Sequence, residues 1–277
     1  MPRFRFFYLL LYEKKSSISM IKAVFFDIDG TFYDHTTNRV LPSTKEAVRK
    51  LKEQGIKIAL CSGRPLQLAA ELPVFDEFCW DGFIGGSGIS VYDENRELIW
   101  ENAFTEDQLK KLFAIAEKHE LPLYVNGEKT FLTRPLPAKK EFVLDLFHLG
   151  VPEIRSWNHE RVDVLSIFEN RDYDFRMFQT VENIRMQPSC DYIMDILKKD
   201  TCKATGIKQL MAYWGLENEA YMAFGDSMND CEMLQEAAVG VAMGNAMDAV
   251  KAYADHICGS SDTPAIHDTL QAYGLIH

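Results

Sequence analysis

The sequence predicts an α/β protein whose core is a doubly wound parallel sheet, with a second, α+β domain inserted into it. An apolar run ends in two carboxylates near residue 27, and strand patterns alternate with helix patterns in both outer parts of the chain. Hairpin patterns occupy the middle. Alternating strands and helices favour a Rossmann-like parallel sheet, and hairpins mixed with helices are typical of an α+β module. We expect the core to comprise residues 20–82 and 189–277, and the inserted domain residues 83–188.

The first element is the apolar run of residues 23–26, which has the composition of a buried strand. Asp27 and Asp29 follow it, with a glycine and a threonine behind them. Because side chains alternate along an extended chain, both carboxylates should point to one side. Two acids at the end of a buried strand repel each other unless a cation or a shared proton intervenes, and Mg²⁺ prefers such oxygen ligands. The alternative interpretation is an ordinary acidic turn.

A helix and a second strand come next. Residues 43–46 read Ser-Thr-Lys-Glu, which predicts a capping box, and Gly55 ends the helix. Residues 56–61 form the strand, and Ser62 follows it. The carboxyl ends of parallel strands meet at one edge of a sheet, so Ser62 is expected beside the two carboxylates. A hydroxyl at this position could instead be only a helix cap.

The middle of the chain has a different pattern. Two hairpins are predicted at residues 89–100 and 121–133, separated by a helix over residues 105–119 that starts with a Thr-Glu-Asp-Gln capping box. A helix over residues 141–149 and strands over residues 162–168 and 184–187 follow. This mixture predicts the inserted α+β domain.

The parallel pattern resumes near Cys190. A helix that begins near Lys203 leads to a short buried strand over residues 221–224. Asp226 and Asp230 lie just past that strand. Two further acids at the carboxyl end of a second strand of one sheet are difficult to attribute to chance, so we expect all four acids at the same edge.

Composition limits the possible functions. The 277 residues carry a net charge of −11, which provides no basic field for nucleic acid or an anionic membrane. The six cysteines are scattered without a C-x-x-C pair, which argues against a zinc site or disulfide framework and suits a reducing, cytoplasmic location. The apolar run at residues 6–12 is too short to span a membrane. We expect Met20 to be the natural start and residues 1–19 to be an extension.

The ordered motifs resemble those of the haloacid dehalogenase-like phosphatases, specifically the Cof-type branch. The first is Asp-x-Asp-Gly-Thr at residues 27–31, and the second is Ser-Gly-Arg at residues 62–64. The third is Lys203 at the start of a helix, and the fourth is Gly-Asp-Ser-x-Asn-Asp at residues 225–230. Residues 241–246 match the usual continuation of the branch. The resemblance covers nearly all of residues 21–277.

The resemblance implies a Mg²⁺-dependent phosphatase that forms an aspartyl-phosphate. Asp27 would be the nucleophile and a metal ligand. Asp29 would be the general acid and base and would give the metal its backbone carbonyl, with Asp226 as a further ligand. The expected substrates are small phosphorylated metabolites such as sugar phosphates, with no nucleic acid, membrane or obligate protein partner.

The same resemblance implies a phosphate-binding set of Ser62, Gly63, Lys203 and Asn229, with Lys203 also supplying positive charge to the reaction. Asp230 would orient Lys203 and metal-bound water.

The inserted domain lies between the second and third motifs, where this branch carries its α/β cap. The branch usually has an Asn-Gly pair where this chain has Ser87 and Gly88, which makes substrate preference harder to predict.

Other interpretations stay open at this point. A phosphoryl-accepting regulatory domain also uses strand-end acids, Mg²⁺ and a lysine, although it lacks a large cap. A non-catalytic binding protein on the same fold and a sugar-phosphate phosphotransferase are further alternatives. Among the remaining charged residues, we expect Arg64 to cap a helix or to pair with a helix acid, and His35 to be a surface or loop residue. Arg134, Lys139 and Lys140 are expected to form a solvated basic face, with steering of phosphate as the alternative.

Overall fold

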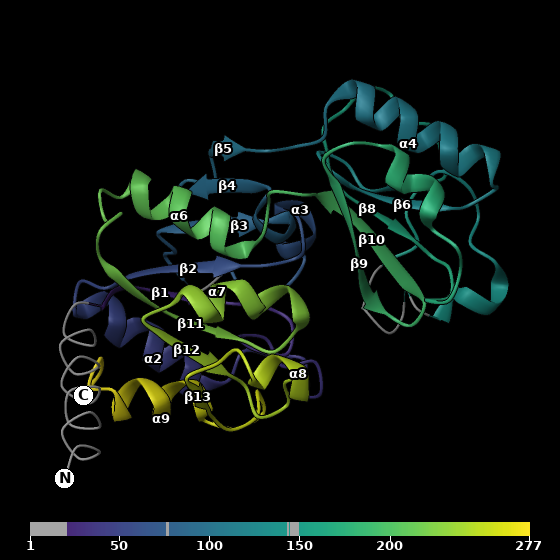
Figure 1. Cartoon of the computed structure of the whole chain (residues 1–277). Helices are drawn as coiled ribbons and strands as arrows, with labels where there is room; N and C mark the ends of the chain where they lie inside the picture. The colour runs from purple at the N-terminus through teal and green to yellow at the C-terminus, as the bar shows by residue number, and fades with distance from the viewer. Residues whose placement is uncertain (1–20, 76–77, 143, 145–149) are drawn as a thin grey trace, which may run out of the picture. The chain divides into compact units, whose positions relative to one another are not determined.

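The computed structural model describes residues 21–75, 78–142, 144 and 150–277 (Figure 1). The chain divides into two compact units. The core unit contains the residues up to Trp100 and those from Cys202 to His277, and the inserted unit is Glu101–Thr201. In the described part of the chain, no helix is long and apolar enough to cross a membrane. The predicted extension of residues 1–19 lies outside the described residues.

The core unit is built on an eight-stranded sheet in the order β13-β12-β11-β1-β2-β3-β4-β5. Neighbours from β13 to β3 run parallel, and β4 is antiparallel to β3. This confirms the predicted parallel sheet. In chain order, the strands are β1 (Ile21–Phe26), β2 (Lys57–Cys61), β3 (Gly82–Gly85), β4 (Ser90–Asp93), β5 (Leu98–Glu101), β11 (Ala220–Gly225), β12 (Val239–Ala242) and β13 (His256–Ile257).

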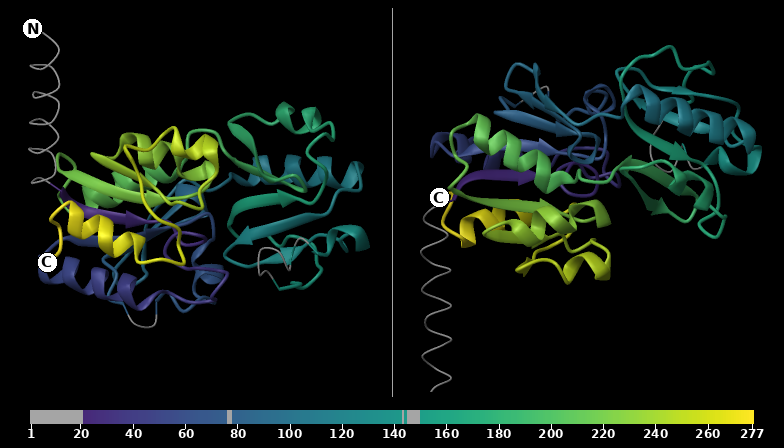
Figure 2. Two further views of the ribbon diagram at one scale, coloured as in Figure 1. Left: turned by 90° about the horizontal axis from the view of Figure 1, so that it is seen from below. Right: turned by 45° about the horizontal axis from the view of Figure 1, so that its top comes forward.

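Helices cover both faces of this sheet (Figure 2). Because side chains alternate along β1, Val24 and Phe26 enter one hydrophobic core, while Ala23 and Phe25 enter the other. The first core includes residues of α2 and α9, and the second includes residues of α6 and α7. A strand buried on both faces explains why β1 reads as a continuous apolar run. The helices are α2 (Pro42–Glu53), α3 (Leu66–Ala69), α6 (Lys203–Tyr213), α7 (Cys231–Glu236), α8 (Asp248–Lys251) and α9 (Ala265–Ala272), with 3₁₀ turns η1 (Gly86–Gly88) and η4 (Met228–Asp230).

The start of α2 differs from its prediction. The helix begins at Pro42 with Leu41 as its N-cap, and no side chain caps it. The capping box predicted at residues 43–46 is therefore wrong. Proline in the first turn supplies the fixed φ angle that starts a helix, and it has no N–H group to be capped.

The inserted unit has a five-stranded antiparallel sheet in the order β7-β6-β8-β10-β9. Helix α4 (Glu106–Lys118) begins with the predicted capping box between Thr105 and Gln108. Its buried Leu109 and Leu112 share a hydrophobic core with residues of β6, β8 and β10. The strands are β6 (Leu123–Gly127), β7 (Phe131–Leu132), β8 (Val162–Ile167), β9 (Ile184–Cys190) and β10 (Ile193–Lys198), and the 3₁₀ turns are η2 (Ala138–Lys140) and η3 (Arg176–Thr180). Most of the helix predicted over residues 141–149 lies outside the described residues.

The structure corrects both predicted domain boundaries. The inserted unit is Glu101–Thr201 instead of residues 83–188. Strands β3, β4 and β5 belong to the sheet of the core unit, and β9 and β10 belong to the sheet of the inserted unit. The sequence pattern could not separate these cases, because an antiparallel hairpin can extend the edge of a mostly parallel sheet as well as form a new one.

The predicted solvated basic face of the inserted unit is corrected at Lys140, and the side chain of Lys139 lies outside the described part of the structure. Lys140 is only 2% exposed, and its ammonium group lies 3.0 Å from Glu169 Oε1 and 2.7 Å from Asn170 Oδ1. Arg134 pairs with Glu117 at 3.2 Å. A buried lysine is stable only when its charge is paired in this way, and the partners of Lys140 lie 29 and 30 residues away in sequence.

Candidate active site

The candidate active site lies at the carboxyl edge of the core sheet, where three adjacent strands end. Asp27 follows β1, Ser62 follows β2 and Asp226 follows β11. Strand β1 pairs in parallel with both β2 and β11, so these three residues leave the sheet side by side. The Asp27 N–H group donates to Phe224 O at 2.9 Å, which continues the pairing of β1 and β11 to the first acid. The sequence-based prediction of one shared edge is confirmed.

Lys203 connects the first and fourth motifs. It is the first residue of α6, and its side chain is fully buried. Its ammonium group binds Asp27 Oδ1 and lies 2.5 Å from Asp230 Oδ1. Burial opposes its positive charge, but the carboxylates of Asp230 and Asp27 raise the pKa of Lys203 well above its usual value. Lys203 therefore carries a permanent charge beside Asp27.

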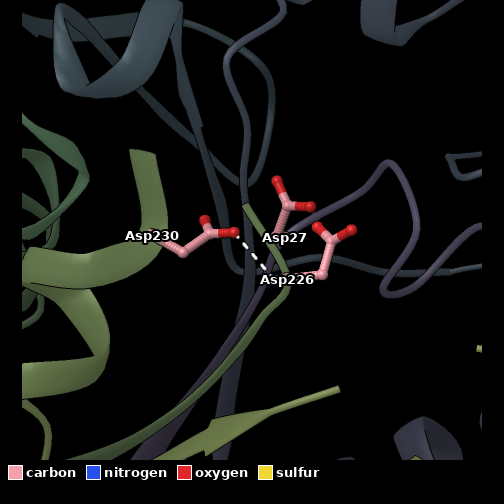
Figure 3. Close-up of side chains that lie close together, drawn as sticks. All are labelled: Asp27, Asp226 and Asp230. Atoms are coloured by element: carbon pink, nitrogen blue, oxygen red, sulfur yellow. Dashed lines mark hydrogen bonds between the residues drawn. The ribbon is translucent and has the colours of Figure 1, made fainter. Parts of the chain in front are cut away.

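Three carboxylates gather at this point. Figure 3 shows Asp27, Asp226 and Asp230 together, and one oxygen from each lies within 4.8 Å of the others. Burial raises the pKa of Asp27 well above its usual value, with Lys203 acting against it. Burial and the nearby Asp230 raise the pKa of Asp226 to about 7. Burial is the largest cause of both shifts, and the neighbouring carboxylates add to it.

The three acids are not equivalent. Asp230 Oδ2 accepts hydrogen bonds from the N–H groups of Asp226 (2.9 Å) and Ser227 (2.8 Å), and Oδ1 accepts from Lys203. Both oxygens of Asp230 therefore accept hydrogen bonds, from the loop that follows β11 and from Lys203. Asp27 and Asp226 accept fewer hydrogen bonds than Asp230 does. Because two close carboxylates with raised pKa values match the oxygen donors that Mg²⁺ prefers, these residues fit a hard divalent cation.

Gly30 lets the first motif approach Asp226 closely. Its φ is +77°, and a Cβ atom at this position would lie 2.5 Å from Asp226 Oδ2. Asn245 Nδ2 donates to Gly30 O at 2.8 Å and lies 3.5 Å from Asp226 Oδ2. We did not predict a site role for Asn245, although it lies in the stretch that matches the branch's usual continuation.

Asp29 lies beside this cluster and contacts the side chains of Arg64 and His35. Arg64 binds it in a bidentate fashion, with Nε 2.8 Å from Oδ2 and Nη2 2.8 Å from Oδ1. His35 Nε2 lies 2.7 Å from Oδ1. Although burial acts in the opposite direction, the hydrogen bonds from His35 and Arg64 hold the pKa of Asp29 well below its usual range. The expectation for Arg64 is corrected, since it pairs with a motif carboxylate that is not in a helix. His35 lies in a loop as expected, and it also contacts this carboxylate.

The second motif forms the opposite side of the site. Ser62 is fully buried, and its Oγ accepts a hydrogen bond from the Arg64 N–H group at 3.0 Å. It therefore holds the local turn, and its hydroxyl keeps a proton to donate. It is not the helix cap of the alternative interpretation, because the N-cap of α3 is Pro65. A Cβ atom at Gly63 would lie 3.0 Å from Asn229 Nδ2 and 3.5 Å from Ser87 Oγ. The predicted phosphate-binding residues Gly63 and Asn229 are thus in close contact.

Comparisons with known proteins agree with this geometry. Residues 24–270 match the family model described as haloacid dehalogenase-like hydrolase. YkrA of Bacillus subtilis (strain 168) is 28% identical over 262 residues, which cover 92% of this chain and 98% of YkrA. The structure of BT1666 from Bacteroides thetaiotaomicron, titled among the phosphatases of this superfamily, has a TM-score of 0.83 at 26% identity and covers 93% of this chain and 96% of its own.

A second solved structure is described more specifically. BT4131, described as a sugar phosphatase of subclass IIB, is 29% identical with a TM-score of 0.79, and the match covers 92% of this chain and 100% of that one. The family match extends over most of the chain and includes all four motifs. The chain therefore belongs to the haloacid dehalogenase-like hydrolases, in their Cof-type branch, and it is a phosphatase.

Proposed function

We propose that this phosphatase is Mg²⁺-dependent and hydrolyses small phosphorylated metabolites, with sugar phosphates as the first class to test, through an aspartyl-phosphate on Asp27. The observation that carries the proposal is the position of Lys203 between Asp27 and Asp230, next to the carboxylate of Asp226. This arrangement combines a nucleophile with fixed positive charge and with donors for a cation.

Asp27 is the proposed nucleophile because its two oxygens have different surroundings. Oδ1 binds Lys203, whereas Oδ2 accepts no hydrogen bond from the described residues. The free oxygen attacks phosphorus, and the phosphate ester bond to the leaving oxygen breaks. Mg²⁺, when bound by Asp27, Asp226 and the backbone carbonyl of Asp29, supplies positive charge that offsets the repulsion between the carboxylate and the phosphate.

The phosphate is held by the second, third and fourth motifs in this proposal. Ser62 donates its hydroxyl proton to a phosphate oxygen, and the Gly63 N–H group and the Asn229 amide lie at the same corner. Lys203 stabilises the charge that develops on the phosphate oxygens, and Asp230 keeps the lysine in place. Preorganised donors of this kind make one of the largest contributions to catalysis.

Asp29 is the proposed general acid and base. It gives a proton to the leaving alkoxide and then takes one from the water that hydrolyses the aspartyl-phosphate. Its bonds to Arg64 and His35 favour the carboxylate form. That form suits the second step directly, whereas the first step requires Asp29 to be protonated before the ester bond breaks.

The inserted unit is proposed to be the cap that selects the leaving group. Its support is its position in the chain, between the second and third motifs, together with its own sheet and hydrophobic core. A cap of this kind excludes water and contacts the part of the substrate that the core unit does not bind.

The test is phosphate release from a panel of phosphorylated metabolites and an aryl phosphate, with Mg²⁺ and with chelator. Asp27→Asn is the active-site variant, and Asp172→Asn, which changes an exposed acid of the inserted unit, is its matched control. We expect metal-dependent release from the wild type and from the control, and none from Asp27→Asn.

Other outcomes separate the alternatives. Phosphorylation of the protein without turnover would indicate a phosphoryl-accepting regulator. Transfer of the phosphoryl group to a second sugar would indicate a phosphotransferase. Metal binding without phosphorylation or release would indicate a non-catalytic protein. Full activity of Asp27→Asn would contradict the assignment of the nucleophile.

A further inference from the structure

Ser87 has an unusual backbone conformation for its residue type. It lies in η1, between β3 and β4, with φ +57° and ψ 38°. This left-handed region is unfavourable for a residue with a Cβ atom, and glycine is its usual occupant. The neighbours Gly86 and Gly88 also have positive φ angles, of +58° and +99°. A serine in a left-handed conformation between two such glycines, and only 6% exposed, points to a function for its side chain.

Its contacts connect two of the motifs. The Ser87 N–H group donates to Ser62 O at 2.9 Å, which ties the turn to the second motif. Ser87 Oγ accepts a hydrogen bond from Asn229 Nδ2 at 3.5 Å, which ties it to the fourth motif. Gly63 of the second motif lies next to the hydroxyl, since a Cβ atom at this glycine would lie 3.5 Å from Ser87 Oγ. The hydroxyl is therefore confined between the two motifs.

The turn is also packed tightly against the third motif. A Cβ atom at Gly88 would lie 1.9 Å from Cys202 O and 3.1 Å from Lys203 N. A Cβ atom at Gly206 would lie 3.2 Å from Gly88 Cα. Two glycines thus allow η1 and the start of α6 to touch through their backbones. Because such contacts leave no room for adjustment, the position of Ser87 is fixed relative to Lys203.

We propose that Ser87 is a positioning residue that sets the rotation of the Asn229 amide at the phosphate-binding corner. The two ends of an amide are a donor and an acceptor, so its rotation decides which of them faces a bound phosphate. Asn229 Oδ1 is buried and has no hydrogen-bond partner in the described part of the chain. Ser87 is therefore the side-chain contact that orients this amide. This inference rests on the proposed function.

The experiment compares Ser87→Gly, Ser87→Asn and the control Glu120→Gly. Glu120 is exposed in the inserted unit and has nearly the same φ, +55°. Both glycine variants relieve a left-handed residue, so neither should lower the melting temperature. Only Ser87→Gly removes the contact to Asn229. We expect it to lower kcat/KM about tenfold, as the loss of an orienting contact does. Asparagine tolerates the left-handed region and offers a polar group, so Ser87→Asn should keep kcat/KM within about threefold of the wild type.

Affinity for inorganic phosphate with Mg²⁺, measured by calorimetry, provides a readout without turnover. We expect it to fall in Ser87→Gly and to stay unchanged in Glu120→Gly. Wild-type kcat/KM and phosphate affinity in Ser87→Gly, or an equal loss in Ser87→Asn, would overturn the inference. A loss of activity in Ser87→Gly that matches a loss of melting temperature would assign Ser87 a merely structural role. A wild type that binds phosphate without releasing it from any ester would contradict the proposed function and leave the Ser87 comparison intact. A wild type that binds no phosphate would overturn both.

Discussion

Replacing Asp226 by asparagine should stabilise the metal-free protein while removing its response to Mg²⁺. Burial and the neighbouring acid raise the pKa of Asp226 from 3.8 to about 7. A carboxyl group with a raised pKa binds more protons in the folded state than in the unfolded state. Stability therefore falls as the pH rises from about 4 to about 7 and then levels off. Asparagine cannot ionise, so the variant escapes this loss.

The size of the effect follows from the shift in pKa. About three pKa units at ~1.4 kcal/mol each give an upper limit of ~4 kcal/mol at pH 8. At pH 5 the carboxyl group costs only ~2 kcal/mol by the same calculation. A buried amide also loses its hydration, which offsets part of this gain. We therefore expect Asp226→Asn to be more stable than the wild type by ~2 kcal/mol at pH 8. That difference corresponds to a rise of about 4–8 °C in melting temperature for a chain of this size.

The assay is thermal unfolding at pH 5 and pH 8, with chelator and with Mg²⁺, and Asp172→Asn is the control. With chelator, the advantage of Asp226→Asn should grow from pH 5 to pH 8. With Mg²⁺ at 100 times its Kd, the wild type should gain ~2.7 kcal/mol, and the variant should gain little. The reasoning is refuted if Asp226→Asn is no more stable than the wild type at pH 8, or if Mg²⁺ stabilises both proteins equally.

Three further predictions concern the lysine, the general acid and the inserted unit. Lys203→Ala leaves Asp27 and Asp230 buried without their cation and should cost ~3–5 kcal/mol in a urea titration at pH 7, whereas a loss below 1 kcal/mol would mean that the pairs contribute little. Asp29→Asn should lower the rate of phosphate release about 10²- to 10⁴-fold in steady-state assays while keeping the stabilisation by Mg²⁺; activity close to that of the wild type would exclude Asp29 as the general acid and base. Leu112→Ala empties a fully buried position in the core of the inserted unit and should cost ~2–5 kcal/mol, which calorimetry would show as a lower melting temperature, and an unchanged melting temperature would contradict the packing described for this unit.

The core sheet and its acidic edge could be predicted from the sequence because their signals are local. From Ala23 to Phe26, strand β1 is buried on both faces, so this stretch appears as one uninterrupted apolar run that ends at Asp27. The boundaries of the inserted unit could not be predicted in this way. The hairpin predicted at residues 89–100 extends the core sheet as β4 and β5, whereas the strand predicted at residues 184–187 is part of β9 in the inserted sheet. Which sheet a hairpin joins depends on strand neighbours that are distant in the chain.

The site residues that lie in sequence motifs could be predicted. The ion pairs and hydrogen bonds between residues distant in sequence could not. Asp27, Asp226 and Lys203 lie in recognisable motifs, and the structure brings them together. The partners of Asp29 were not predictable: Arg64 is 35 residues away, and His35 lies in a polar loop without ligand spacing. Such partners are brought together only by the folding of the chain, and their sequence spacing does not indicate the contact.

The most direct test of the central claim is the identity of the phosphorylated residue during turnover. Rapid quenching of the Asp29→Asn variant with an aryl phosphate and Mg²⁺, followed by mass spectrometry of its peptides, would trap the intermediate. An aryl leaving group departs without a general acid, so the intermediate still forms, and its slow hydrolysis without the general base lets it accumulate. We predict one phosphoryl group on the peptide that contains Asp27, and none in the Asp27→Asn protein. A phosphoryl group on another residue, or phosphate release with no phosphorylated peptide at any time point, would contradict the account.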